Sequence, residues 1–194
     1  MGVTWMLAGA ALQEAVKLLI SFDPELYGII FLSLRVTLTA LCFAALAGIP
    51  LGVLLALKQF RGRGLLLNVI NAFMSLPPVV VGLSVYILLS NQTGLVGDHR
   101  ILFTPMAMVI AQFFLALPLM TGLTVTAILN VDRLVARTAR SLGASGWQIS
   151  LTLVKEARFS IYSALIVVLG RLLGEVGAVM MVGGKVSYQT RVMT

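Results

Sequence analysis

The chain is poor in charge, cysteine and histidine. Only 11% of its 194 residues are charged, whereas about a quarter are charged in a typical soluble domain. Its one cysteine, Cys42, is expected to be buried in an apolar run and permits no internal disulfide. Its one histidine, His99, is expected to be a solvated loop residue rather than a ligand or proton carrier. Together with one deep carboxylate, Glu175, these residues make no metal set or activated nucleophile, which argues against a membrane-embedded enzyme.

Apolar sequence is what the chain has in abundance, at 59% of its residues. A transmembrane helix needs about 20 mostly apolar residues, and four stretches qualify: 26–57, 65–90, 101–129 and 159–182. The alternative is a very apolar soluble core, but so little polar surface could not cover four such stretches. The sequence therefore predicts an all-α, polytopic membrane bundle.

The net charge of +7 is unevenly distributed between the loops. A basic chain can indicate nucleic-acid binding, but here the loops between apolar runs carry the basic residues, as membrane orientation requires. One side carries Lys58, Arg61, Arg63, Arg133, Arg137, Arg140, Lys155 and Arg158. The other side carries Lys17, Arg100, Lys185 and Arg191. The excess predicts a multi-pass protein of the inner or plasma membrane, with the loops 58–64 and 130–158 in the cytoplasm and the N-terminus outside.

Two regions are expected along the chain. Residues 1–22 have the apolar spacing of an amphipathic helix lying on the outer surface, although a transmembrane helix there would invert the topology. Residues 23–194 form the transmembrane domain, whose first helix begins near Pro24 and is expected to bend around Gly48, Pro50 and Gly52.

The loop 131–158 has a helical pattern of its own. Asp132 is the expected cap of a first helix, Gly143 and Gly146 are expected to break it, and a second helix runs from Trp147 to about Arg158. A DNA-binding helix pair is disfavoured because the loop is pinned between two apolar runs. The loop is interpreted as the docking element for a soluble partner.

Two features inside the apolar runs are unusual. Pro77 and Pro78 leave backbone carbonyls unpaired, which either lines a wet or protein-lined cavity or makes an ordinary kink. Arg171 and Glu175 are four residues apart, so they either pair with each other or shape the field of a translocation cavity, and both roles can hold at once. An anchor for soluble proteins would have no use for such costly features.

Three motifs in chain order resemble the membrane subunits of type I ATP-binding-cassette importers. They are residues 76–82 (LPPVVVG), the basic segment 137–149 (RTARSLGASGWQI), and residues 174–184 (GEVGAVMMVGG) followed by TRVMT. Within these importers the chain is similar to the oxyanion permeases, most of all to the tungstate type, with molybdate and sulfate permeases as relatives. The similarity extends over nearly the whole chain from Leu18.

The resemblance implies a mechanism and a set of site residues. Two permease copies form a homodimer with the pathway between them, two cytoplasmic ATPase subunits dock on the loops, and an external binding protein delivers the oxyanion. ATP and Mg belong to the ATPase subunits, and no G-x-x-x-x-G-K-[ST] phosphate loop occurs in this chain. The implied coupling residues are Ala136, Arg137, Ala139, Arg140, Leu142, Gly143, Ala144 and Trp147. The implied pathway residues are Ser75, Pro77, Pro78, Gly82, Arg171, Glu175 and Gly177.

Three departures from the family pattern stand out. Arg137 occupies the place of a leading Glu, which puts a salt bridge from that position to the ATPase in doubt. Lys155 and Glu156 replace a Leu-Pro pair, so the second loop helix is expected to continue toward the last apolar run. The family core has five spans and this sequence supplies four, so a final helix after Thr194 is expected to be missing from it.

Overall fold

The computed structural model describes residues 24–90, 102–175 and 177–183, and within these ranges it forms helices and no strand. The expected interfacial helix at 1–22 and His99 lie outside the described residues. The helices, in chain order, are α2 (Pro24–Leu57), α3 (Arg63–Ser75), α4 (Pro78–Leu89), α5 (Pro105–Leu129), α6 (Arg133–Ser141), α7 (Gly146–Glu156), α8 (Arg158–Leu173) and α9 (Gly177–Gly183).

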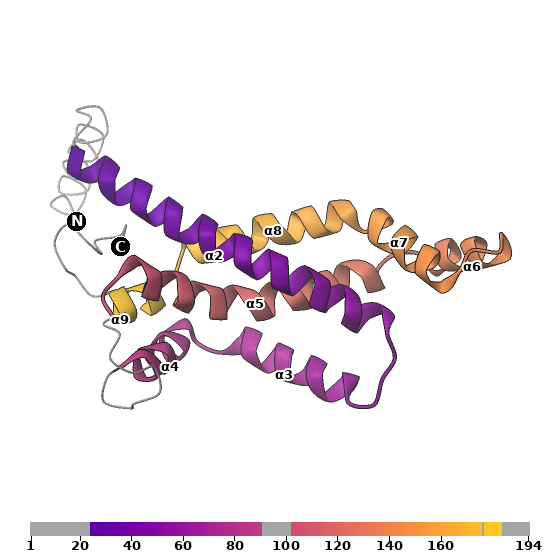
Figure 1. Cartoon of the computed structure of the whole chain (residues 1–194), viewed down its shortest axis with the longest axis horizontal. Coiled ribbons are helices and arrows are strands. Elements are labelled where there is room, and N and C mark those ends of the chain that lie inside the picture. The colour runs from indigo at the N-terminus through magenta and orange to yellow at the C-terminus, as the bar shows by residue number, and fades with distance from the viewer. Residues whose placement is uncertain (1–23, 91–101, 176, 184–194) are drawn as a thin grey trace, which may run out of the picture.

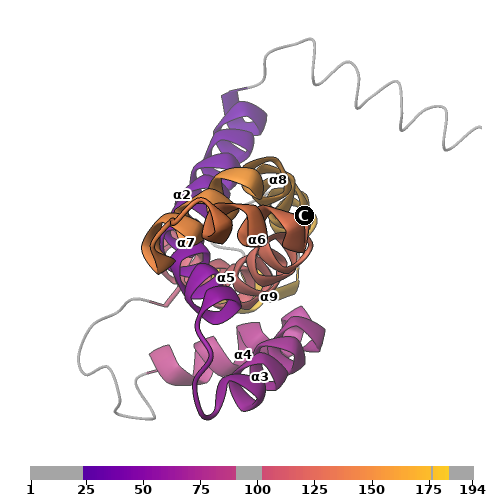
Figure 2. The same ribbon diagram turned by 90° about the vertical axis from the view of Figure 1, so that its right-hand side faces the viewer.

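The helices form an elongated bundle around α5 (Figure 1). Helices α2 and α8 pack against α5 along the long axis, and α3 packs against it from another side (Figures 1 and 2). Helices α6 and α7 lie at one end of the bundle, and α4 and α9 lie at the other. The connection 58–62 and the loop 130–157 therefore share one end of the molecule, as the charge pattern predicted.

Two glycines let α2 approach α5 closely. A β-carbon on Gly52 would lie 2.6 Å from the Thr124 Cβ, and one on Gly48 would lie 3.0 Å from the Met120 Cβ. Residues four apart share a helix face, and small residues at this spacing allow helix backbones to meet. The sequence predicted a bend here. Helix α2 continues through Pro50 as one helix, and the two glycines have a packing role in addition.

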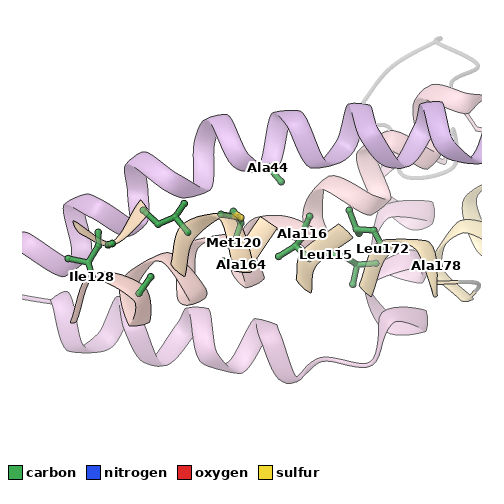
Figure 3. Close-up of a cluster of buried hydrophobic side chains, with 12 residues drawn as sticks. Ala44, Leu115, Ala116, Met120, Ile128, Ala164, Leu172 and Ala178 are labelled. Atoms are coloured by element: carbon green, nitrogen blue, oxygen red, sulfur yellow. The ribbon is translucent and has the colours of Figure 1, made fainter. Parts of the chain in front are cut away.

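Half of the buried residues in the core between these helices are alanines. The core includes Ala44, Leu115, Ala116, Met120, Ile128, Ala164, Leu172 and Ala178, drawn in Figure 3. Alanines at the contacts keep the helices close, while Met120 and the leucines fill the space between them. This row of residues fixes α2, α5 and α8 as one unit.

The second apolar run is interrupted at its proline pair. Helix α3 ends at Ser75, helix α4 begins at Pro78, and the two helices are bent by 101°. Leu76 and Pro77 have extended ψ angles of 137° and 132°, as residues that precede proline prefer. Pro78 occupies the first helical position, where its missing N–H costs nothing. The chain turns a corner here, so this is not an ordinary kink within a continuous helix.

The last apolar run is interrupted as well, where a single helix over 159–182 was expected. Helix α8 ends at Leu173, and α9 begins only at Gly177. The glycines at 170, 174 and 177 have low helix propensity, and the Glu175 carboxylate needs polar surroundings. The physical reason for the interruption is thus already present in the motif 174–184.

The outer surface of the bundle is apolar. Helices over Tyr27–Leu57 and Pro105–Leu129 are long and apolar enough to cross a membrane, and the bent pair α3–α4 makes a third crossing if it is one span. Large apolar side chains such as Phe31 and Ile166 are exposed. Cys42 is exposed too, so the expectation that it is buried was wrong. Such a surface suits lipid or another chain, and it confirms the all-α membrane bundle.

Candidate functional site

The first candidate site is the helical elbow formed by α6, the turn 142–145 and α7. It stands at one end of the bundle, and Figure 2 looks directly onto it. Within 133–156, all of which the structure describes, no residue is buried. Its shape therefore comes from its own local hydrogen bonds rather than from the core.

Local signals define each end of the two elbow helices. The Asp132 carboxylate accepts a hydrogen bond of 2.8 Å from the Leu134 N–H, which confirms Asp132 as the cap of α6. At the start of α7 the Ser145 hydroxyl accepts from the Gln148 N–H, and the Gln148 side chain accepts from the Ser145 N–H. This reciprocal pair is a capping box, which the sequence analysis missed although its Ser-x-x-Gln pattern was visible. Gly146 was predicted to break a helix. It is instead the first residue of α7.

Gly143 shapes the turn of the elbow. Its φ of 79° lies in the left-handed region, which is costly for residues with a β-carbon. The Gly143 N–H donates to the Arg140 carbonyl, and the Ala144 N–H donates to the Ala139 carbonyl, each at 3.0 Å. These two bonds form the Schellman pattern that ends a helix. Within the turn 142–145, Gly143 is thus the one residue whose backbone conformation favours glycine.

The elbow presents apolar side chains beside its basic ones. Leu142 is 82% exposed and Trp147 is 76% exposed, although both are large and apolar. Arg137, Arg140 and Gly143 are exposed, while Ala136, Ala139 and Ala144 are partly buried. An exposed tryptophan and leucine between arginines have the composition of a protein-binding surface.

Two further basic residues, Arg63 and Arg158, begin helices α3 and α8 at the same end of the bundle (Figure 1). The Arg63 guanidinium donates a hydrogen bond of 2.6 Å from Nε to the Leu55 carbonyl in the last turn of α2. A cation at this position also favours the negative end of the helix dipole. Arg158, at the start of α8, places its guanidinium 4.7 Å from the centre of the Phe159 ring.

The continuity between the elbow and α8 agrees with the sequence. Only Ala157 separates α7 from α8, and its φ and ψ of −72° and −5° are close to helical. The Ala157 N–H donates to the Leu153 carbonyl, and the Ile161 N–H donates to the Ala157 carbonyl. The second elbow helix thus continues into α8, as expected where Lys155 and Glu156 replace the Leu-Pro pair.

The second candidate site lies at the interrupted helices. The structure brings Gly82 of α4 against α9, because a β-carbon on Gly82 would lie 2.7 Å from the Ala178 Cα. Gly177 is the first residue of α9. Ser75 and Pro77 are exposed at the α3–α4 corner, where the Ser75 hydroxyl donates to the Asn71 carbonyl. Pro78 is partly buried.

Arg171 and Glu175 pair across the end of α8. The Arg171 Nε lies 3.8 Å from the Glu175 Oε2, and the two side chains are 51% and 11% exposed. This distance gives a charge contact rather than a hydrogen bond. The interpretation as a neutral pair is confirmed in its geometry. Because the Arg171 side chain is half-exposed, its guanidinium can also contact groups outside this chain.

One polar group near this pair escaped the sequence analysis. Gln112 of α5 is 3% exposed, and its Oε1 has no hydrogen-bond partner among the described residues. It lines a small cavity together with Thr37 and Glu175. Gln112 is the one Asn or Gln in the apolar run 101–129. An amide side chain in the middle of an apolar run is a signal of a functional or packing role, and the sequence could have revealed it.

These features are typical of a membrane transport protein: an apolar helical bundle, two interrupted helices with a charge pair at one of them, and an exposed basic elbow. The chain belongs to the family of binding-protein-dependent transport system inner membrane components, whose profile matches residues 48–193. It is thus a multi-pass membrane subunit of a transport system that also has ATPase and substrate-binding subunits, and its relatives are permeases rather than enzymes.

Three relatives illustrate the similarity. The chain is 41% identical to the tungstate uptake system permease protein TupB of Peptoclostridium acidaminophilum, over 94% of this chain and 79% of that protein. It is 36% identical to a probable anion ABC transporter permease protein of Haloferax volcanii, over 84% of this chain and 70% of that one. It is 34% identical to TupB of Campylobacter jejuni, over 70% of this chain and 56% of that one. The family resemblance drawn from the three motifs is therefore confirmed.

Proposed function

We propose that this chain is the permease subunit of an ATP-driven importer whose oxyanion is tungstate. The observation that carries the proposal is its similarity, over 94% of its length, to a tungstate uptake permease. The elbow and the interrupted helices add physical support, because they supply a partner-binding surface and a polar break within the apolar bundle.

The orientation in the membrane follows from the charge pattern. The end that bears the elbow and the connection 58–62 carries eight lysines and arginines. Because basic loops remain in the cytoplasm, this end is cytoplasmic and the N-terminus of the chain lies outside. Helices α4 and α9 then lie toward the outer face, where the binding protein would dock.

The elbow is the surface that would bind the ATPase subunit. None of its side chains is buried, its fold is set by local caps, and α7 leads directly into α8. A movement of the elbow would therefore be transmitted along α8 to the break at Glu175. ATP and Mg would be held by the ATPase subunits, so this chain contributes the coupling and not the hydrolysis.

The pathway would lie between two copies of the chain, next to the interrupted helices. A passing divalent oxyanion needs hydrogen-bond donors and a mild positive potential, but tight binding would prevent its release. The half-exposed Arg171 supplies positive charge, and Glu175 offsets it. Selectivity would then reside mainly in the external binding protein.

A reconstituted system tests the proposal. The chain, its ATPase and its binding protein are placed in liposomes, and ATP hydrolysis and uptake are measured with tungstate, molybdate or sulfate. We expect tungstate to stimulate both at the lowest concentration. Stimulation by sulfate or molybdate alone would replace the substrate, and no stimulation by any of the three would overturn the proposal.

A further inference from the structure

The cavity beside Gln112 has a partly polar lining inside an otherwise apolar bundle. It has a volume of about 60 Å³ between α2, α5 and the break after α8, and its polar lining includes Ser33, Thr37, Gln112 and Glu175. Val36, Leu172 and Val179 are buried apolar residues that also line it. One water molecule needs about 10–15 Å³ of space that a water-sized sphere can occupy. The cavity therefore has room for more than one.

Two acceptor groups in the lining have no hydrogen-bond donor among the described residues, the Gln112 Oε1 and the Glu175 carboxylate. Gln112 Oε1 is an acceptor with no partner among the described residues. The Glu175 carboxylate oxygens accept hydrogen bonds, and the contact to Arg171 at 3.8 Å is too long for a hydrogen bond. The Ser33 hydroxyl donates to the Ile29 carbonyl of its own helix at 2.9 Å. An occupant that satisfies these two acceptors must donate hydrogen bonds.

This requirement selects the kind of occupant. An oxyanion offers only acceptor oxygens and negative charge, so the cavity would repel it beside Glu175. Water donates two hydrogen bonds and needs no compensating charge. An unpartnered buried carbonyl oxygen is costly, and water is the usual partner in a polar cavity of this size.

We propose that this cavity is a hydration site in which water donates hydrogen bonds to Gln112 Oε1 and to the Glu175 carboxylate. The water links α5 to the break between α8 and α9. Gln112 is then a positioning residue for the Arg171–Glu175 pair and does not contact the transported anion. The effect of Gln112 on uptake rests on the proposed import function, but the presence of water does not.

Radiolytic labelling of the assembled transporter tests the hydration directly. Ionising radiation converts bound water into hydroxyl radicals that label the side chains beside it. Leu172 lines the cavity and is 1% exposed, whereas Leu55 is equally buried at 1% and is not among the residues that line it. We expect labelling of Leu172 well above that of Leu55. Equal, low labelling of both leucines would overturn the proposal.

The variant Gln112→Met separates positioning from folding. Methionine has a similar length, but its thioether sulfur is only a weak acceptor. The water bound to Oε1 should therefore be lost, and Leu172 labelling should fall toward the level of Leu55. The melting temperature in detergent should stay the same or rise, while uptake should fall about tenfold, the scale of a lost hydrogen bond in a buried site. A lower melting temperature that accounts for the lost uptake would contradict the positioning role, and so would full uptake.

Two further measurements complete the test. The matched control is Thr124→Val, because Thr124 lies on the same helix, is 0% exposed and has its hydroxyl satisfied by the Met120 carbonyl at 2.7 Å. It should leave uptake and Leu172 labelling unchanged.

Uptake that depends on sodium or potassium in wild type but not in Gln112→Met would identify a cation in place of water and overturn the proposal. If wild type imports no oxyanion, the proposed function fails, and the Leu172 labelling still decides the hydration site.

Discussion

Gly82 of α4 and Ala178 of α9 meet backbone to backbone, since a β-carbon on Gly82 would lie 2.7 Å from the Ala178 Cα. This contact joins the corner made by the prolines to the break that follows α8. The two interruptions of the bundle are thus one packed unit, although about a hundred residues separate them along the chain.

Gly82→Ala should loosen this unit. The added methyl group meets backbone atoms that cannot rotate away, and overpacking of this kind costs about 1–3 kcal/mol. We expect a lower melting temperature in detergent and weaker uptake. The control is Gly170→Ala, because nothing lies within 4 Å of a β-carbon at that position of α8 and alanine favours a helix. Equal behaviour of the two variants would contradict the close contact.

The parts of the molecule that depend on local sequence could be predicted, and the parts that depend on packing could not. Asp132 and Gly143 were identified correctly because a cap and a left-handed turn are set by neighbouring residues. The role of Gly48 and Gly52 depends on which helix lies opposite, which one sequence does not state. The Gln112 cavity requires three segments far apart in the chain to converge.

The turn of the elbow makes a specific prediction about Gly143. Gly143→Val should weaken binding of the ATPase subunit, because a β-branched residue at a φ of 79° is strained and disturbs the Schellman turn. Asparagine tolerates this conformation, so Gly143→Asn should retain most of the affinity. Affinities are measured by titrating purified ATPase subunit onto the reconstituted chain. Equal loss with valine and asparagine would mean that the glycine surface itself, and not the turn, makes the contact.

Trp147 should be a major contact of the elbow. Burial of an exposed tryptophan in a partner's pocket commonly contributes about 2 kcal/mol or more to binding. We therefore expect Trp147→Ala to weaken ATPase binding at least about thirtyfold without changing the melting temperature. Phe159→Ala removes an aromatic side chain of α8 that is similarly exposed at 68%, and it serves as the control. Equal ATPase affinity in wild type and Trp147→Ala would remove the elbow from the docking surface.

The orientation can be tested with the chain's one cysteine removed. In a Cys42→Ser background, Thr138→Cys labels the exposed face of α6, and Met106→Cys labels the opposite end of the bundle. We expect a membrane-impermeant thiol reagent added to whole cells to react at position 106 and to reach position 138 only after permeabilisation. Reaction at position 138 in intact cells would place the elbow outside and invert the proposed orientation.

Arg171 and Glu175 offer a test that separates pairing from action on the anion. Because Arg171 is 51% exposed, removing the pair should change stability by less than about 1 kcal/mol. Arg171→Gln should nevertheless reduce uptake severalfold, since it leaves the Glu175 carboxylate, 11% exposed, without its counter-charge. If pairing is the role of Arg171, the double variant Arg171→Gln/Glu175→Gln should recover much of the uptake. If the guanidinium instead attracts the oxyanion, the double variant should stay as slow as Arg171→Gln, and the half-exposed charge is then part of the pathway itself.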